Sequence, residues 1–247
     1  MYRGRVAFFA FDGAERYFGT PDLAPGVRVR FDPDKLFAAR ERGTGRPVDR
    51  HLAGDEGLVV DEIATGVLVW PCSLWRVDEL ERPVRLRPGR EWVRCRAFTV
   101  LEQVPAWLVA GPHGNAVEWV ITRARELTSD QVEAIAALPE DDEEQLTRRM
   151  WDRWLRDHRG GSPVGCGLST LHQAVEAAAR RAGPGLFGWD ERDEVEVLRD
   201  PGWLRAHRAA YGAALALGAP ELLPAEQNAV LTRRWTGVFG SPDLPRR

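Results

Sequence analysis

The residues with the clearest chemical potential lie in a glycine-rich segment, His158 to Gly167, that precedes a predicted helix beginning at Ser169. Glycines let backbone N–H groups approach a ligand, and the first turn of a helix presents unpaired N–H donors with positive partial charge. An anionic or phosphate-bearing ligand is therefore one interpretation of Gly160–Ser169. The Walker pattern is incomplete because Cys166 occupies the place of the phosphate-binding lysine, so a plain connection between two helices is the alternative. The ligand-binding candidates of this segment are Arg159, Gly165, Cys166, Gly167 and Ser169.

Cys166 is also a candidate nucleophile. A thiol between glycines near the start of a helix gains thiolate character from the helix dipole, and the thiolate is the reactive form. His172 and His113 are the nearest histidines that could act as its base, but a nucleophile needs an oriented base and spacing alone does not show one. The sequence thus offers Cys166 as a catalytic candidate without deciding whether the chain is an enzyme.

Tryptophan is frequent, with ten residues in 247. Exposed indoles form stacking platforms for sugars and nucleic-acid bases, whereas most tryptophans contribute buried area to a core. Trp70, Trp75 and Trp92 are the candidates for a ligand-binding platform. Core packing is the competing interpretation for each of them.

Neither a metal nor a cofactor is predicted. Three cysteines and five histidines never occur at paired ligand spacings such as C-x-x-C or H-x-x-x-H, so a metal site would have to assemble from distant segments. No complete dinucleotide-binding or other cofactor motif is present.

Basic residues in this chain are almost all arginines. Of 34 lysine and arginine residues only Lys35 is a lysine, a skew typical of a high-G+C bacterial genome, so the arginine count says little about ligands. The formal net charge is −3 and the charges are interspersed, which disfavours a polyanion-binding surface. One predicted helix concentrates basic residues, but it also contains acidic residues at ion-pairing distance along the helix, so nucleic-acid binding is not expected. The basic residues of this helix are Arg148, Arg149, Arg153 and Arg156.

We expect a cytoplasmic protein. Cys72, Cys95 and Cys166 are scattered singly and odd in number, which suits a reducing compartment, and the first residues lack the apolar run of a signal peptide. No apolar stretch reaches the roughly 18 residues that cross a bilayer, so no membrane partner is expected.

The first part of the chain, residues 1–112, reads as strands. Alternating or continuous apolar runs predict strands at Val6–Phe11, Val27–Phe31, Leu58–Ile63, Val67–Trp70, Val84–Leu86 and Trp92–Val104. One short helix is predicted at Lys35–Arg40, after Asp32 and Pro33. The strands follow one another without helical crossovers, which favours a mostly antiparallel sheet or small barrel.

The second part, residues 113–247, has helical periodicity. We expect a bundle packed on the first part, giving an α+β fold. An apolar stripe begins after Asn115, Thr128 and Gln131 form a capping box, and an acidic run, Glu140 to Glu144, lies at the positive end of the next helix dipole. Further helices are predicted at Thr170–Arg181, at 201–217 after the cap Asp200, and at 225–235 after Pro224.

The closing segment AVLTRRWTGVFGSPDLP resembles the end of uncharacterised Ala- and Trp-rich helical proteins of high-G+C bacteria. The resemblance covers under a tenth of the chain. It implies a helical C-terminal part and no activity.

These observations lead to two functional hypotheses. The first is a non-enzymatic protein, regulatory or accessory, that acts through contacts with another protein, because a chain of this size shows no complete catalytic motif but many amphipathic helices. The alternative is a small enzyme or ligand-binding protein with a pocket between the β part and the helices. An exposed apolar patch would favour the first hypothesis, and buried ionisable groups in a cleft the second.

Overall fold

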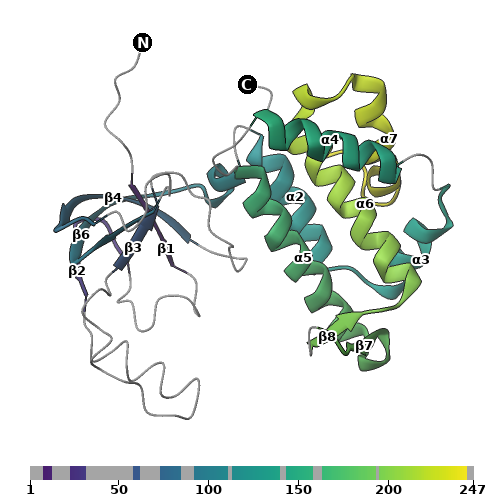
Figure 1. The fold of residues 1–247 in the computed structure, drawn as a ribbon, viewed down its shortest axis with the longest axis horizontal. Coiled ribbons are helices and arrows are strands. Elements are labelled where there is room, and N and C mark those ends of the chain that lie inside the picture. The colour runs from purple at the N-terminus through teal and green to yellow at the C-terminus, as the bar shows by residue number, and fades with distance from the viewer. Residues whose placement is uncertain are drawn as a thin grey trace. The chain divides into compact units, whose positions relative to one another are not determined.

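The structure, a computed structural model, describes residues 8–12, 23–31, 58–61, 73–84, 92–110, 113–139, 143–157, 163–192 and 195–243. Side chains are described in these ranges except at residues 8–12, 59, 61, 92, 109 and 151–169. The fold is α+β, as the sequence predicts, with an antiparallel sheet followed by helices (Figure 1). The chain forms two compact units, Met1–Ala106 and Trp107–Arg247, which we call the sheet unit and the helical unit. Over the described ranges, no helix combines the length and apolar character that crossing a bilayer requires.

The sheet unit contains six strands, all paired antiparallel in the order β2-β6-β4-β1-β3-β5. Their bounds are β1 Phe8–Asp12, β2 Arg28–Arg30, β3 Leu58–Asp61, β4 Ser73–Glu81, β5 Trp92–Cys95 and β6 Ala97–Val104. The predicted strands at 6–11, 27–31 and 58–63 therefore exist with shifted ends, and the single strand predicted at 92–104 is divided at Arg96 into β5 and β6. Of the predicted strand Val84–Leu86 the structure describes Val84, which forms an isolated bridge. The predicted strand Val67–Trp70 and helix Lys35–Arg40 lie outside the described residues.

The sheet is rolled. Only Arg96 separates β5 from β6, yet three strands lie between them in the sheet order. Neighbouring strands are about 4.8 Å apart, so a flat sheet would hold β5 and β6 roughly 19 Å from one another, much farther than one residue spans. An antiparallel bridge between Val84 and Arg94 joins the segment after β4 to β5 and is consistent with the same curvature.

One hydrophobic core fills the inner face of this sheet. Its buried members are Leu23, Val29, Leu58, Val60, Trp75, Val77, Val93, Cys95, Phe98 and Val100. Burial raises the pKa of the Cys95 thiol to about 11, against the weaker opposing effect of Arg28. Cys95 is therefore a packed, protonated side chain that behaves as a small hydrophobic residue.

Strand β4 is the longest of the six and was not predicted. Its sequence SLWRVDELE places Leu74 and Trp75 next to each other in the interior, and register shifts interrupt its pairing with β6 after Arg76 and after Asp78. Bulges break the alternation on which strand prediction depends, because two residues then face one on the neighbouring strand. The second half of β4 is mostly charged, which made the strand still harder to predict from the sequence.

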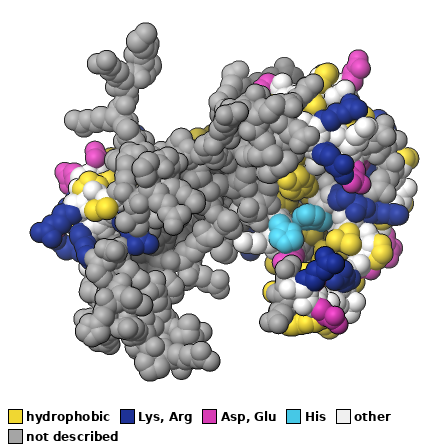
Figure 2. Space-filling view, viewed as in Figure 1, with side chains coloured by type: hydrophobic (Ala, Val, Ile, Leu, Met, Phe, Trp, Pro, Cys, Tyr) yellow, Lys and Arg dark blue, Asp and Glu magenta, His cyan; other side chains and the backbone are white. Residues whose placement is uncertain are grey.

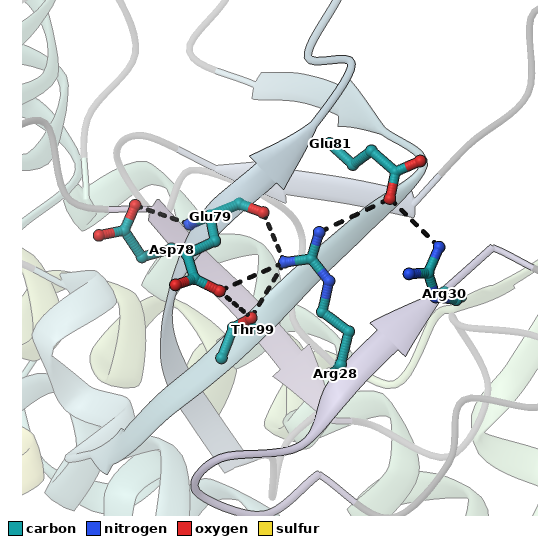
Figure 3. A network of polar contacts seen from close by, with 6 residues as sticks. All are labelled: Arg28, Arg30, Asp78, Glu79, Glu81 and Thr99. Atoms are coloured by element: carbon teal, nitrogen blue, oxygen red, sulfur yellow. Dashed lines mark hydrogen bonds and ion pairs between the residues drawn. The ribbon is translucent and has the colours of Figure 1, made fainter.

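A polar network links the C-terminal end of β4 to β2 and β6 (Figure 3). Glu79 adopts a left-handed backbone conformation with φ of 52° inside the bulge. Arg28 of β2 donates to the Glu79 carbonyl at 2.7 Å and to Thr99 Oγ1 of β6 at 3.0 Å, while Thr99 donates to the Glu79 carboxylate at 2.6 Å. Glu81 accepts from Arg30 at 3.2 Å and lies 3.6 Å from Arg28. Three strands are thus cross-linked at the bulge.

The helical unit comprises six α-helices among the described residues, with a β-hairpin between the fourth and fifth of them (Figure 1). Their bounds are α2 Gly114–Arg125, α3 Ser129–Ala137, α4 Glu143–Asp157, α5 Pro163–Ala182, α6 Pro201–Gly218 and α7 Ala225–Phe239. The hairpin strands are β7 Phe187–Asp190 and β8 Val195–Leu198, and the 3-10 helices are η2 Ala106–Ala110, η3 Pro184–Leu186 and η4 Pro220–Leu222.

Helix α6 is the centre of this unit and contacts α2, α3, α4, α5 and α7. Alanines on several of its faces are buried, and their small side chains let neighbouring helices approach closely. Trp203 and Trp235 are 3% and 0% exposed, so both pack in the core. Close approach is most demanding at Gly114, where an added Cβ would lie 1.9 Å from the Trp107 carbonyl oxygen.

Two predicted helix starts are confirmed in atomic detail. Thr128 accepts from the Gln131 amide at 3.3 Å while the Gln131 side chain accepts from the Thr128 amide at 3.1 Å, which is the complete capping box. Asp200 accepts from the Trp203 amide at 3.0 Å and Pro201 occupies the first turn of α6.

The start of α5 corrects the prediction. The helix begins at Pro163, six residues before the predicted cap Ser169, so the backbone of Gly165, Cys166 and Gly167 is helical. Proline suits the first helical position because its φ is already helical and its missing N–H needs no partner there. The two glycines disfavour a helix by only about 1 kcal/mol each, a cost that the packing of α5 on α2 and α6 can offset.

Candidate functional site

A groove of about 360 Å³ lies between the first two turns of α4 and the middle of α6. Its lining residues, which define what we call the histidine groove, are Glu143, Glu144, Thr147, Arg148, His207, Arg208 and Tyr211. His207 and Tyr211 are one helical turn apart and therefore share a face of α6. Histidine, basic and hydrophobic side chains gather on the face of the helical unit seen in Figure 2.

A second histidine contacts His207 but is not among the residues that line the groove. His172 of α5 places Nδ1 3.4 Å from Nε2 of His207, and the two rings meet edge to face with centroids 5.2 Å apart. On the other side of the same ring, Nε2 of His172 is 3.5 Å from Oε1 of Glu176, one turn further along α5. A carboxylate and two imidazoles thus follow one another toward the groove.

The position of Glu176 distinguishes the two neutral tautomers of His172. With its proton on Nε2, toward Glu176, the ring would present the lone pair of Nδ1 to His207. Without a bound ligand, His207 can then donate its Nε2–H to His172. Its Nδ1 remains an acceptor.

The groove perturbs two of its ionisable side chains. Burial lowers the pKa of His207 to about 4, and the electrostatic effects of His172 and then Arg208 lower it by smaller amounts. Burial also raises the pKa of Tyr211. At neutral pH the groove therefore presents an uncharged imidazole and a protonated phenol, and perturbed groups in a cleft are a common mark of functional sites.

The charges on the α4 side of the groove have partners. Arg148 donates to Glu144 at 3.1 Å on the helix surface. Glu143 pairs at 3.1 Å with Arg234 of α7, a side chain that is 1% exposed and also donates through Nε and Nη2 to the Ile135 carbonyl. The acidic run at the start of α4 was predicted to act through the helix dipole, and Glu143 additionally forms this buried ion pair. The groove is therefore a mixed surface and not a convergence of unneutralised positive charge.

The β7–β8 hairpin exposes an aromatic side chain. Trp189 is 63% exposed, whereas Phe187, two residues earlier on the same strand face, is half-buried under the guanidinium of Arg180 at 4.3 Å. Arg180 also pairs with Glu196 at 2.7 Å, and Glu196 is the cross-strand partner of Trp189. Helix α5 therefore holds the strand that presents the exposed indole.

Among the sequence-predicted site residues, the structure describes the side chain of Trp75. Trp75 is 8% exposed and belongs to the sheet core, which the core-packing interpretation predicts. The structure describes the backbone of Trp92 in β5 and of Gly165, Cys166, Gly167 and Ser169 in α5. The side chains of Trp92, Cys166 and Ser169 lie outside the described residues. Trp70 and Arg159 lie outside the described residues altogether, so the roles proposed for them stay predictions.

The residues that form the groove were not predicted from the sequence as a site. His207 and Tyr211 lie one turn apart in a helix whose buried positions are mostly alanine, and this placement of two large polar side chains is the signal that the sequence offers. His172 was considered only as a partner of Cys166. Its contact with His207, 35 positions away, could not be read from spacing.

Comparison with protein-family models, with curated proteins and with solved structures finds no match for this chain. Function is therefore argued from the geometry of the hairpin and the histidine groove. Within the described ranges, no group of three or more histidine, cysteine, aspartate or glutamate side chains is arranged to hold a metal ion.

Proposed function

We propose that this chain is a non-enzymatic bacterial protein, regulatory or accessory, that acts in the cytoplasm by binding another protein through the β7–β8 hairpin. The observation that supports this proposal is the 63% exposure of Trp189 on a strand anchored to α5. Tryptophan and arginine are the residues most enriched at the energetic centres of protein interfaces. A large rigid indole also loses little conformational entropy when it binds.

The hairpin suits a partner with an apolar pocket inside a charged rim. Trp189 would insert into the pocket, while the ion pairs Arg180–Glu196 and Arg199–Asp190 border it at 2.7 and 3.3 Å. Charged residues at the rim set orientation and association rate more than affinity.

Site-specific photo-crosslinking tests this proposal. A photoreactive phenylalanine analogue at position 189, in the full chain expressed in its native host, is expected to give one discrete protein adduct. The matched control is Val195, which is 46% exposed in the same hairpin but faces the opposite side of the ribbon from Trp189. Trp189→Ala should weaken the purified complex at least tenfold, as expected of a central aromatic anchor. Adducts at 195 alone, or none at 189, would contradict the proposal.

A ligand-binding protein or small enzyme is the second candidate, and the histidine groove favours it. The pocket predicted between the two parts stays a prediction, whereas the groove lies entirely within the helical unit and contains the neutral His207. A ligand-observed NMR screen of small polar compounds against the full chain tests this candidate. Binding that is lost in Tyr211→Phe and His207→Gln but kept in His113→Gln, which changes an exposed histidine next to α2, would support it.

A further inference from the structure

The geometry points to a binding site for a divalent transition-metal ion, such as Zn²⁺, between Nδ1 of His172 and Nε2 of His207. This site is independent of the hairpin and of its partner. It would be formed by two helices, with α5 and α6 each supplying one imidazole.

The separation of the two nitrogens fits one shared metal ion. Zinc binds histidine nitrogen at about 2.0–2.1 Å, and two such bonds at a tetrahedral angle place the nitrogens about 3.3–3.4 Å apart. The observed separation is 3.4 Å. A direct hydrogen bond from an N–H donor is usually shorter, at about 2.9–3.0 Å, so the pair is spaced more widely than hydrogen bonding alone would favour.

Glu176 supplies a second, separate feature of metal sites. A histidine that binds metal through one nitrogen almost always donates its other N–H to a carboxylate or carbonyl, which fixes the ring and raises its basicity. Oε1 of Glu176 is 3.5 Å from Nε2 of His172, the nitrogen that faces away from His207. The carboxylate thus lies on the side of the His172 ring opposite the metal position, where metal-bound histidines usually have such a partner.

The chemistry of the two donor atoms indicates which ions suit the site. Imidazole nitrogen is a ligand type that selects Zn²⁺, Cu²⁺ and Ni²⁺ over Mg²⁺ and Ca²⁺.

The site has two protein ligands among the described residues, so its other coordination positions are open. Structural zinc sites use four protein ligands and catalytic sites three, and this site is accordingly expected to bind more weakly than either. Water or a polar group of a molecule in the histidine groove would fill the open positions, because His207 lines that groove. A bound metal ion would thereby place an electrophilic centre at one side of the groove.

Calorimetric titration of ZnCl₂ into the EDTA-stripped full-length protein tests the inference. We expect one equivalent of Zn²⁺ to bind, binding to be lost in His172→Gln and in His207→Gln, and the affinity to fall about 10-fold or more in Glu176→Gln. His113→Gln, which removes an exposed histidine far along the sequence from both ligands, is the control and should bind like the parent chain. Circular dichroism melting of each variant in EDTA separates loss of a ligand from loss of the fold.

A spectroscopic readout keeps the test decisive if a variant is unstable. In the parent chain, ¹⁵N imidazole spectra should show Zn²⁺ bound at Nδ1 of His172 and at Nε2 of His207, with the other nitrogen of each ring carrying the proton. No binding by the parent chain, magnesium binding of equal strength, or zinc binding that persists in both glutamine variants would overturn the inference.

Discussion

The bulge network of the sheet unit and the histidine groove of the helical unit both gather polar side chains, but they use them in opposite ways. In the network, Arg28 donates to the Glu79 carbonyl and to Thr99 and forms an ion pair with the Glu79 carboxylate. Its guanidinium also forms an ion pair with Glu81 (Figure 3). In the groove, His207 is held neutral by burial beside an open volume. Groups that satisfy one another stabilise a fold, whereas a neutral acceptor beside a cavity remains available to a ligand.

Burial decides how much each arrangement contributes to stability. The arginines and glutamates of the bulge network are one-third to more than two-thirds exposed, so solvent screens their attraction. The Glu143–Arg234 pair at the base of the groove is almost completely enclosed. If burial, and not the number of contacts, determines the contribution to stability, substitution at the Glu143–Arg234 pair should cost more than substitution in the bulge network.

The largest effect is expected from Arg234→Met. The substitution removes the ion pair of the buried Glu143 carboxylate with Arg234 and the guanidinium donors to the Ile135 carbonyl, and removing one partner of a buried pair costs about 3–5 kcal/mol. Chemical denaturation followed by circular dichroism measures the free energy of unfolding. The control is Arg148→Met, which removes the exposed pair with Glu144 and should cost less than about 1 kcal/mol. Equal costs for the two variants would contradict the ranking.

A second, smaller effect concerns pH. The pKa of His207 is about 4 in the folded chain and near 6.5 when unfolded, so between these values the unfolded chain binds one more proton. The free energy of unfolding should therefore rise with pH from about 4 to 6.5, be fully present above 6.5, and fall as the solution is acidified through this window. The change is at most about 3 kcal/mol, and less because the ring is partly exposed. Charged or titratable groups around His207 are His172, Glu176, Arg208, Tyr211, Glu143, Glu144 and Arg148.

Denaturation in EDTA at a series of pH values measures this dependence without bound metal. His207→Gln should flatten the stability profile between pH 4 and 6.5, whereas His113→Gln should leave it unchanged. A profile for His207→Gln as steep as that of the parent chain would show that other groups cause the acid sensitivity.

The contrast between the two regions also explains what the sequence could predict. Local signals are strong where a few neighbouring residues decide the structure, so the capping box at Thr128 and the cap at Asp200 were predicted correctly. The order of strands followed by helices gave the α+β class. Strand β4 escaped because its bulges break the alternating pattern, and the start of α5 was misplaced because glycines indicated a loop.

The candidate sites were less predictable because they depend on contacts between distant segments. His172 meets His207 only because α5 packs against α6, and Glu143 meets Arg234 across 91 positions. The β7–β8 hairpin is too short for a periodic signal, so the exposure of Trp189 could not be anticipated. Residue type marked aromatic and cysteine candidates, but burial and neighbours determine which of them can act.

Arg28→Met should have a smaller effect than either change in the helical unit. It removes the donor to the Glu79 carbonyl and to Thr99, and we expect a loss of about 1 kcal/mol because the site is partly exposed. Hydrogen exchange of β2 and β6 peptides, read by mass spectrometry, reports this loss within the sheet unit. Arg30→Met, which removes one ion pair of a side chain that is 69% exposed, should change exchange much less. Faster exchange in the helical unit instead would contradict a local role.

The smallest and most specific effect is expected at Glu79, where the backbone is left-handed with φ of 52°. Glu79→Ala and Glu79→Gly both remove the carboxylate that accepts from Thr99, so the difference between them isolates the backbone. A residue with a Cβ is disfavoured in this conformation by about 1 kcal/mol, whereas glycine adopts it freely. The free energy of unfolding of Glu79→Gly should therefore exceed that of Glu79→Ala by about 1 kcal/mol, which is the reverse of the usual order for a strand. Hydrogen exchange of β4 and β6 peptides at increasing urea concentrations measures this difference. If alanine is the more stable, the left-handed bulge does not persist once the carboxylate is gone, and the network of Figure 3 would then be the cause of the bulge and not its consequence.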